Sequence, residues 1–217
     1  MKNTKRPFLW VLILIFTGIF SMAFGQQKVI PPPESGRTSS NRDFFKFLAR
    51  LEFGLGHGQH KIDDFTFTGL AIPMDVVLGV GIFPKTYIHG TFGVTIIDRP
   101  TYTVDDIDYD FEGTLAMFDV GLGLTTYPIP QKIYVSGTIY GTTMASFAGE
   151  EVYNAEIGVA FKLKGGIDFM LGSAFSVGFS AFLYYAGMKD QADDFGYQAQ
   201  INNMVLGVCL TTTLGNL

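Results

Sequence analysis

From residue 44 onward, apolar and polar residues alternate with the period of two that is typical of a β-strand. In residues 87–96, for example, Ile88 and Phe92 lie on one face of such a strand, and His89 lies on the other. An α-helix would scatter each of these sets around its circumference. The pattern therefore predicts an all-β fold.

Eight segments show this alternation, at residues 45–57, 67–82, 87–97, 112–127, 132–145, 153–171, 175–187 and 197–214. Three connections are short and contain turn residues, at 83–85, 128–131 and 172–174. They alternate with four longer, polar connections at 58–66, 98–111, 146–152 and 188–196. The order predicts an antiparallel up-and-down meander with tight turns at one end and larger loops at the other, which is the plan of an outer-membrane barrel.

The polar face of these segments favours a membrane barrel over a soluble, lipocalin-like barrel, which would have a Lys- and Glu-rich surface. Here that face consists mostly of Gly, Ser, Thr, Asn and Tyr. Its charged residues are Lys46, Arg50, Glu52, Asp75, Asp119, Glu156, Lys162, Lys164 and Asp168. Eight strands enclose a space only wide enough for side chains to fill. We therefore expect these residues to form a structural, internally paired network and not to line a pore.

The lengths of the segments and the positions of their aromatic residues agree with a membrane barrel. The segments are 11 to 19 residues long, which is enough for the roughly 9–11 residues that a tilted strand needs to cross a bilayer. Aromatic residues gather near the segment ends, as expected for belts at the headgroup layers: Phe45, Phe47, Phe83, Tyr127, Phe169 and Phe175 on the turn side, and Phe65, Phe67, Phe111, Tyr153, Tyr185 and Tyr197 on the loop side. Because an unpaired backbone group in hydrocarbon costs several kcal/mol, the first and last strands must pair. We predict an eight-stranded antiparallel up-and-down transmembrane β-barrel.

The amino-terminal residues predict export. Basic residues, an apolar run over 8–20 and small residues before Gln26 form the pattern of a signal peptide, residues 1–25. Residues 26–43 contain three consecutive prolines and are expected to be a flexible periplasmic lead-in to the barrel domain, residues 44–217. The only cysteine, Cys209, lies far from the cleavage site, which excludes a lipid-modified cysteine there and an intramolecular disulfide.

Composition and charge exclude two further classes of protein. Charged residues make up 16% of the chain, against about 25% in typical soluble domains. Beyond the signal peptide no run of 18 apolar residues exists, which excludes a helical membrane protein. Removing the three basic residues of the signal peptide changes the formal net charge from −5 to −8, which argues against nucleic acid as a partner.

From Phe44 to the end, the eight alternating segments with their short turns and long loops resemble the small outer-membrane β-barrel family, the OmpX-like and OmpA-transmembrane-like barrels. The resemblance implies location in a bacterial outer membrane, contact with lipid and lipopolysaccharide, and insertion by the barrel-insertion machinery. One departure is the end of the last strand, where such proteins usually have an aromatic residue and this chain has Thr213-Leu214-Gly215-Asn216-Leu217.

Two clusters in the predicted loops are candidate metal sites. The carboxylates of Asp106, Asp108, Asp110 and Glu112 suit Ca²⁺ or Mg²⁺, but they lack the glycine and the distal glutamate of an EF-hand. We interpret them as a solvated acidic surface that shares divalent ions with lipopolysaccharide. His57 and His60, near Asp63 and Asp64, could hold Zn²⁺, but we interpret them as ordinary loop histidines.

No catalytic motif accompanies this architecture. The chain has no Gly-x-Ser-x-Gly sequence, although folding could bring Ser146 or Ser180 near a histidine. The predicted function is therefore structural, in envelope integrity or in contact with a surface or envelope partner, with no cofactor. Two alternatives stay open: a lipid-modifying acyl hydrolase or acyltransferase, and a narrow conduit or binding pocket for small hydrophobic molecules.

Overall fold

A computed structural model describes residues 46–63, 65–104, 107–129, 132–148, 151–172, 174–190 and 198–215. Over these ranges the regular secondary structure consists of β-strands. Within them no helix is long and apolar enough to span a membrane. The predicted signal peptide and lead-in lie outside the described residues, so their assignments stay predictions.

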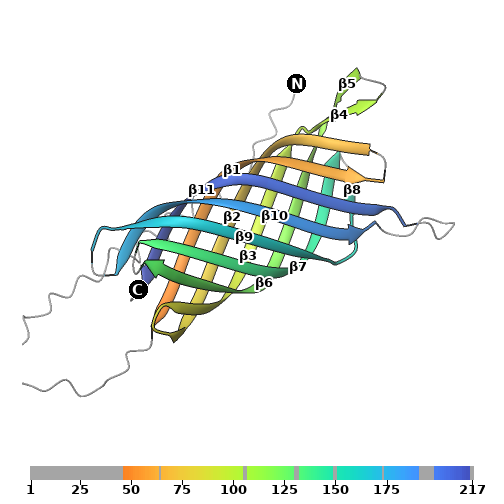
Figure 1. The fold of residues 1–217 in the computed structure, drawn as a ribbon. Helices are drawn as coiled ribbons and strands as arrows, with labels where there is room; N and C mark the ends of the chain where they lie inside the picture. The colour runs from red at the N-terminus through yellow and green to blue at the C-terminus, as the bar shows by residue number, and fades with distance from the viewer. Residues whose placement is uncertain are drawn as a thin grey trace, which may run out of the picture. The chain divides into compact units, whose positions relative to one another are not determined.

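Eight long antiparallel strands form the wall of a closed barrel (Figure 1). They are β1 (Phe47–Ile62), β2 (Phe65–Phe83), β3 (Thr86–Asp98), β6 (Gly113–Ile129), β7 (Ile133–Ala148), β9 (Gly158–Met170), β10 (Phe175–Lys189) and β11 (Gln200–Gly215). Their order around the wall is β1-β11-β10-β9-β7-β6-β3-β2, and β2 pairs again with β1. The first and last strands pair from Leu48–Gly215 to Ile62–Ile201. The predicted eight-stranded, closed, up-and-down barrel is confirmed.

Three short strands extend this wall at the loop end. In the predicted loop 98–111, β4 (Thr101–Val104) and β5 (Ile107–Asp110) form a hairpin, and β4 pairs with β2 through Phe67–Tyr102. The third short strand, β8 (Glu151–Asn154), pairs with the end of β7. Figure 1 shows the β4–β5 hairpin projecting from the rim of the barrel. The loop end is therefore more ordered than the sequence pattern predicts.

The prediction of a long first loop at 58–66 was wrong. Strand β1 continues to Ile62, β2 begins at Phe65, and Asp63 in the turn between them has a positive φ of 48°. The polar run 57–61 reads as a loop in the sequence, but it stays paired to β11 and β2 on both sides. A strand can be polar on both faces where it extends past the apolar layer, so polarity alone misplaced this boundary.

The single predicted strand 153–171 is divided into β8 and β9. Pairing with β7 runs through Ala145–Asn154 on one side of the break and through Thr142–Gly158 on the other, which leaves one extra residue on the β8–β9 side. Such a bulge exchanges the inward and outward faces of the strand. Ala155, which the alternation places on the outer face, is therefore buried, and Glu156, which it places on the inner face, is exposed.

The outer face of the barrel wall is apolar. Phe92, Val120 and Leu122, near the middle of adjacent strands, are 53%, 65% and 70% exposed. Isoleucine, leucine, valine and phenylalanine side chains on all eight long strands share this outward exposure. The area is far larger than the few hundred Å² that a soluble monomer exposes, and it fits contact with lipid hydrocarbon.

A charge placed on this face should destabilise the barrel. We expect Val120→Arg to lower the free energy of unfolding in liposomes by about 2–4 kcal/mol, the cost of a buried cation near the bilayer midplane. Tyr109→Arg, at an exposed position on β5, should lower it by less than about 1 kcal/mol. Urea titration followed by circular dichroism measures both, and equal effects would contradict the lipid-facing assignment.

Candidate functional site

Seven charged side chains fill the middle of the barrel interior. Each is at most 4% exposed, and together we call them the charged plug: Arg50, Glu52, Asp75, Asp119, Lys162, Lys164 and Asp168. All seven belong to the set that the alternation places on the inner face. A water-filled pore would leave such side chains accessible, so the interior is closed at this level.

Four members of the plug form a chain of alternating charges across the interior. Lys162 Nζ lies 2.6 Å from Asp75 Oδ2, and Lys164 Nζ lies 3.5 Å from the same oxygen. Lys164 Nζ also lies 2.7 Å from Glu52 Oε2. Because β9 carries both lysines while β1 and β2 carry the carboxylates, these ion pairs join strands that are not neighbours in the wall. Burial makes each charge costly unless it is paired in this way.

Arg50 is the centre of a second group. Its Nη2 donates to Asp168 Oδ2 at 2.8 Å and to the Tyr127 hydroxyl at 2.5 Å, and its Nε donates to Thr213 Oγ1 at 2.8 Å. The Tyr127 hydroxyl in turn donates to Asp168 Oδ2 at 2.9 Å. The guanidinium carbon lies 3.8 Å from the ring centre of Tyr134, a cation–π distance. Arg50 thus links β1 to four other strands.

Two glycines make room for the carboxylates of the plug. Gly93 on β3 lies between Asp75 and Asp119 in the sheet, and a Cβ there would come within 2.6 Å of Asp75 Oδ1. Gly178 has the same relation to Asp168 Oδ1, also at 2.6 Å. Asp119 itself accepts a hydrogen bond from the Tyr184 hydroxyl at 2.8 Å. The inward glycines are therefore part of the plug's packing.

Two residues predicted for the network lie elsewhere. Glu156 is exposed and accepts a hydrogen bond from Gln198 Nε2 at 3.0 Å, because the bulge between β8 and β9 turns it outward. Lys46 precedes β1 and is half-buried, and its Nζ donates to the Pro84 carbonyl at 2.8 Å, at the turn-side rim. Tyr127 was predicted for the turn-side aromatic belt but is buried beside the plug. It lies an even number of residues from Asp119 on β6, so both side chains point inward.

The three histidines have different environments. His57 is exposed on the outer face of β1, whereas His60, in the same strand, is 1% exposed and points inward. The prediction that both belong to a loop was therefore wrong. His89 is buried, with Nε2 3.3 Å from Ser136 Oγ and Nδ1 3.1 Å from Thr91 Oγ1. The Ser136–His89 pair is enclosed in the polar interior and was not anticipated from the sequence.

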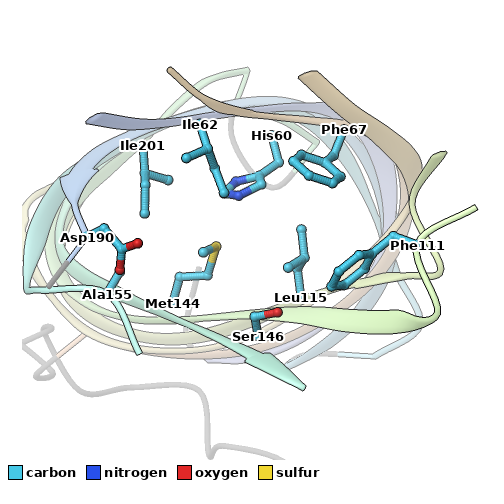
Figure 2. Close-up of a pocket in the computed structure, with 10 residues that line it drawn as sticks. All are labelled: His60, Ile62, Phe67, Phe111, Leu115, Met144, Ser146, Ala155, Asp190 and Ile201. Carbon is cyan, nitrogen blue, oxygen red and sulfur yellow. The ribbon is translucent and has the colours of Figure 1, made fainter. Parts of the chain in front are cut away.

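An apolar pocket of about 220 Å³ lies in the loop-side half of the interior (Figure 2). Its residues come from strands around the whole wall and from the connections beside them: His60, Ile62, Phe67, Phe111, Leu115, Met144, Ser146, Ala155, Asp190 and Ile201. The buried members, such as Leu115 and Met144, form its floor, and half-buried members such as Phe67 and Asp190 form its rim. The sequence contains an indication of this pocket, because the inward positions of the strands become apolar toward the loop end.

The pocket does not bring a nucleophile and a base into contact. Figure 2 shows Ser146 on the wall opposite His60. The Nδ1 atom of His60 is hydrogen-bonded to Asn203 Oδ1, and in the described part of the chain no hydrogen bond joins Ser146 to His60. Ser180, the other candidate nucleophile, is buried, and none of the hydrogen bonds of His60 and His89 in the described part of the chain reaches its Oγ.

The acidic cluster falls partly outside the described residues. Asp106 is not described, Asp108 and Asp110 lie on β5, and Asp110 and Glu112 are exposed. Among the described residues, no group of three or more His, Cys, Asp or Glu side chains is arranged to hold a metal ion. A metal site at this cluster stays untested.

Comparison with known proteins finds solved structures with a similar fold. No protein-family model matches the chain, and no curated protein matches it in sequence. Neisserial surface protein A is similar in structure, with a TM-score of 0.50, 8% identity, and coverage of 77% of this chain and 96% of that one. The outer membrane protein OprG from Pseudomonas aeruginosa has a TM-score of 0.47, 10% identity, and coverage of 78% and 96%. Ail of Yersinia pestis has a TM-score of 0.46, 12% identity, and coverage of 77% and 99%.

The closed eight-stranded wall, its apolar outer face and the fold shared with Neisserial surface protein A define the class of protein. It is a small transmembrane β-barrel with the fold of an outer-membrane protein. The resemblance to OmpX-like and OmpA-like barrels is confirmed at the level of the fold.

Breaking the plug should destabilise the barrel. Arg50→Met leaves Asp168 buried without its cation, and we expect the free energy of unfolding to fall by about 3–5 kcal/mol. The double variant Arg50→Met/Asp168→Asn should recover part of this loss, because it removes the unpaired charge. Arg99→Met, which disrupts an exposed ion pair with Asp98, should change the value by less than about 1 kcal/mol. Unfolding in detergent measures all three, and equal effects of the two single variants would place Arg50 outside a stabilising network.

Proposed function

We propose that the chain is a non-conducting outer-membrane barrel that serves envelope integrity or presents its loop end to a partner, without catalysis. The charged plug is the observation that supports this most directly. Its ion pairs are almost completely inaccessible to solvent, so neither ions nor hydrated solutes have a path through the interior at that level. With the interior closed, the loop end is the part of the barrel that can contact a partner, and here it carries the added β4–β5 hairpin.

Conductance across planar bilayers tests this proposal. The wild-type barrel should give no steady porin-like current. A charge-balanced variant with serine at Glu52, Asp75, Lys162 and Lys164 removes two anions and two cations together, so it opens the plug without changing its net charge. Asp119 keeps its hydrogen bond from Tyr184. This variant should conduct. Steady open-channel current through the wild-type protein would contradict the proposal.

A deletion strain separates the structural role from lipid chemistry. We expect the lipid A mass spectrum to be unchanged on deletion, because His60 and Ser146 lie on opposite walls of the pocket. The outer membrane should become more permeable to hydrophobic dyes, or a stoichiometric envelope protein should be found with the barrel purified from native membranes. A change of lipid A acylation that the restored gene reverses would favour the enzyme instead.

The pocket supports a second candidate function, the binding of small hydrophobic molecules. A cavity of about 220 Å³ exceeds the roughly 150 Å³ that is sufficient to bind benzene in an engineered protein. Because the charged plug closes the interior on the turn side of the pocket, this function would be binding and not passage along the barrel axis.

A further inference from the structure

We propose that the loop-side pocket binds a small, neutral, hydroxylated apolar molecule and that His60 accepts the hydrogen bond of its hydroxyl group. This inference rests on the second candidate function and specifies the ligand's chemistry. It combines three observations on the described residues: an apolar cavity, a buried histidine nitrogen without a partner among them, and the lack of Lys and Arg among those that line the cavity. Each of the three restricts the ligand in a different way.

The unpartnered atom is Nε2 of His60. The His60 side chain is almost fully buried and lines the cavity, and Figure 2 shows its ring directed into it. Nε2 has no hydrogen-bond partner among the described residues. A buried polar atom without a partner costs about 1–3 kcal/mol, and a ligand that supplied the missing hydrogen bond would recover this.

Asn203 determines which hydrogen bond His60 can make. Its Oδ1 atom lies against Nδ1 of His60, and an amide oxygen only accepts, so Nδ1 carries the proton. In the neutral imidazole the other nitrogen, Nε2, is then an acceptor. The ligand must donate at this point, which a hydroxyl group does and an ether or a ketone does not.

The remaining walls restrict the rest of the ligand. Leu115, Met144 and Ile201 are apolar, and Phe67 and Phe111 meet edge to face with ring centres 5.8 Å apart. The ten lining residues include neither Lys nor Arg, and their one carboxylate, Asp190, lies at the half-buried rim, so a carboxylate or phosphate would be desolvated in the cavity without a counter-ion. The cavity is also smaller than the roughly 300 Å³ at which sites for drug-sized ligands begin. These features favour a neutral molecule of phenol-like size.

Two isomeric probes separate recognition of the hydroxyl from simple filling of the cavity. 4-Methylphenol and anisole have the same atoms, but only 4-methylphenol can donate a hydrogen bond. In lipid nanodiscs we expect both to shift the NMR signal of the Met144 methyl group, with 4-methylphenol binding at least about fivefold more tightly, the ratio that one neutral hydrogen bond gives. The ring ¹⁵N spectrum of His60 should show a proton on Nδ1, and the Nε2 signal should move with 4-methylphenol only.

Matched variants assign the effect to one histidine. In His60→Leu the affinity ratio of the two probes should fall to about one. In His57→Leu, which changes an outward histidine of the same strand, the ratio should stay as in the wild type. Ala155→Leu adds a side chain at the cavity wall and should abolish binding of both probes while the barrel stays folded.

Equal affinity of the two probes for the wild-type protein, or a proton on Nε2, would overturn recognition of the hydroxyl by His60. Undiminished binding to Ala155→Leu, or no binding of either probe to the wild type, would overturn the pocket itself. Neither result depends on bilayer conductance, which tests the proposal of a non-conducting barrel separately.

Discussion

In hydrocarbon, every backbone amide and carbonyl group must find its hydrogen-bond partner within the protein. For a chain of strands this requires closure, and here β1 pairs with both β2 and β11. Closure at eight strands then sets a lumen that side chains can fill. Both the charged plug and the loop-side pocket follow from how this one chain fills that narrow space.

The interior is filled in two chemically different ways. In the middle of the barrel, three cations and four carboxylates pair with each other and with tyrosine and threonine hydroxyls, so that buried charge is compensated. Toward the loops the inward positions become apolar, with Met144, Ile201 and their neighbours. The apolar part packs less completely than the charged part and leaves the pocket. The charged plug therefore closes the lumen to solutes, and the apolar part beside it leaves space for a ligand.

Alternation and connection lengths were sufficient to predict the barrel, its strand number and the pairing of its ends. The alternation of inward and outward positions was also sufficient to place Arg50, Lys162 and the five other members of the plug inside the barrel. The alternation gave the wrong face for Glu156, because a bulge between β8 and β9 exchanges the inward and outward positions there. No residue type in the sequence indicates this bulge. The first loop was predicted too long because the polar residues at the end of β1 were interpreted as a loop, although they belong to the strand. Which charges pair, and which side chains surround the pocket, could not be predicted, since both depend on strands far apart in sequence facing each other across the closed wall.

The salt bridges of the plug join residues that are 87 to 118 positions apart in the chain. The first two strands contribute Arg50, Glu52 and Asp75, but their counter-charges are all on β9. A partly assembled sheet that lacked β9 would hold those charges without their oppositely charged partners. The charges of the first two strands are thus neutralised only when β9 joins the sheet. This disfavours half-inserted intermediates and makes entry into the bilayer close to an all-or-none event.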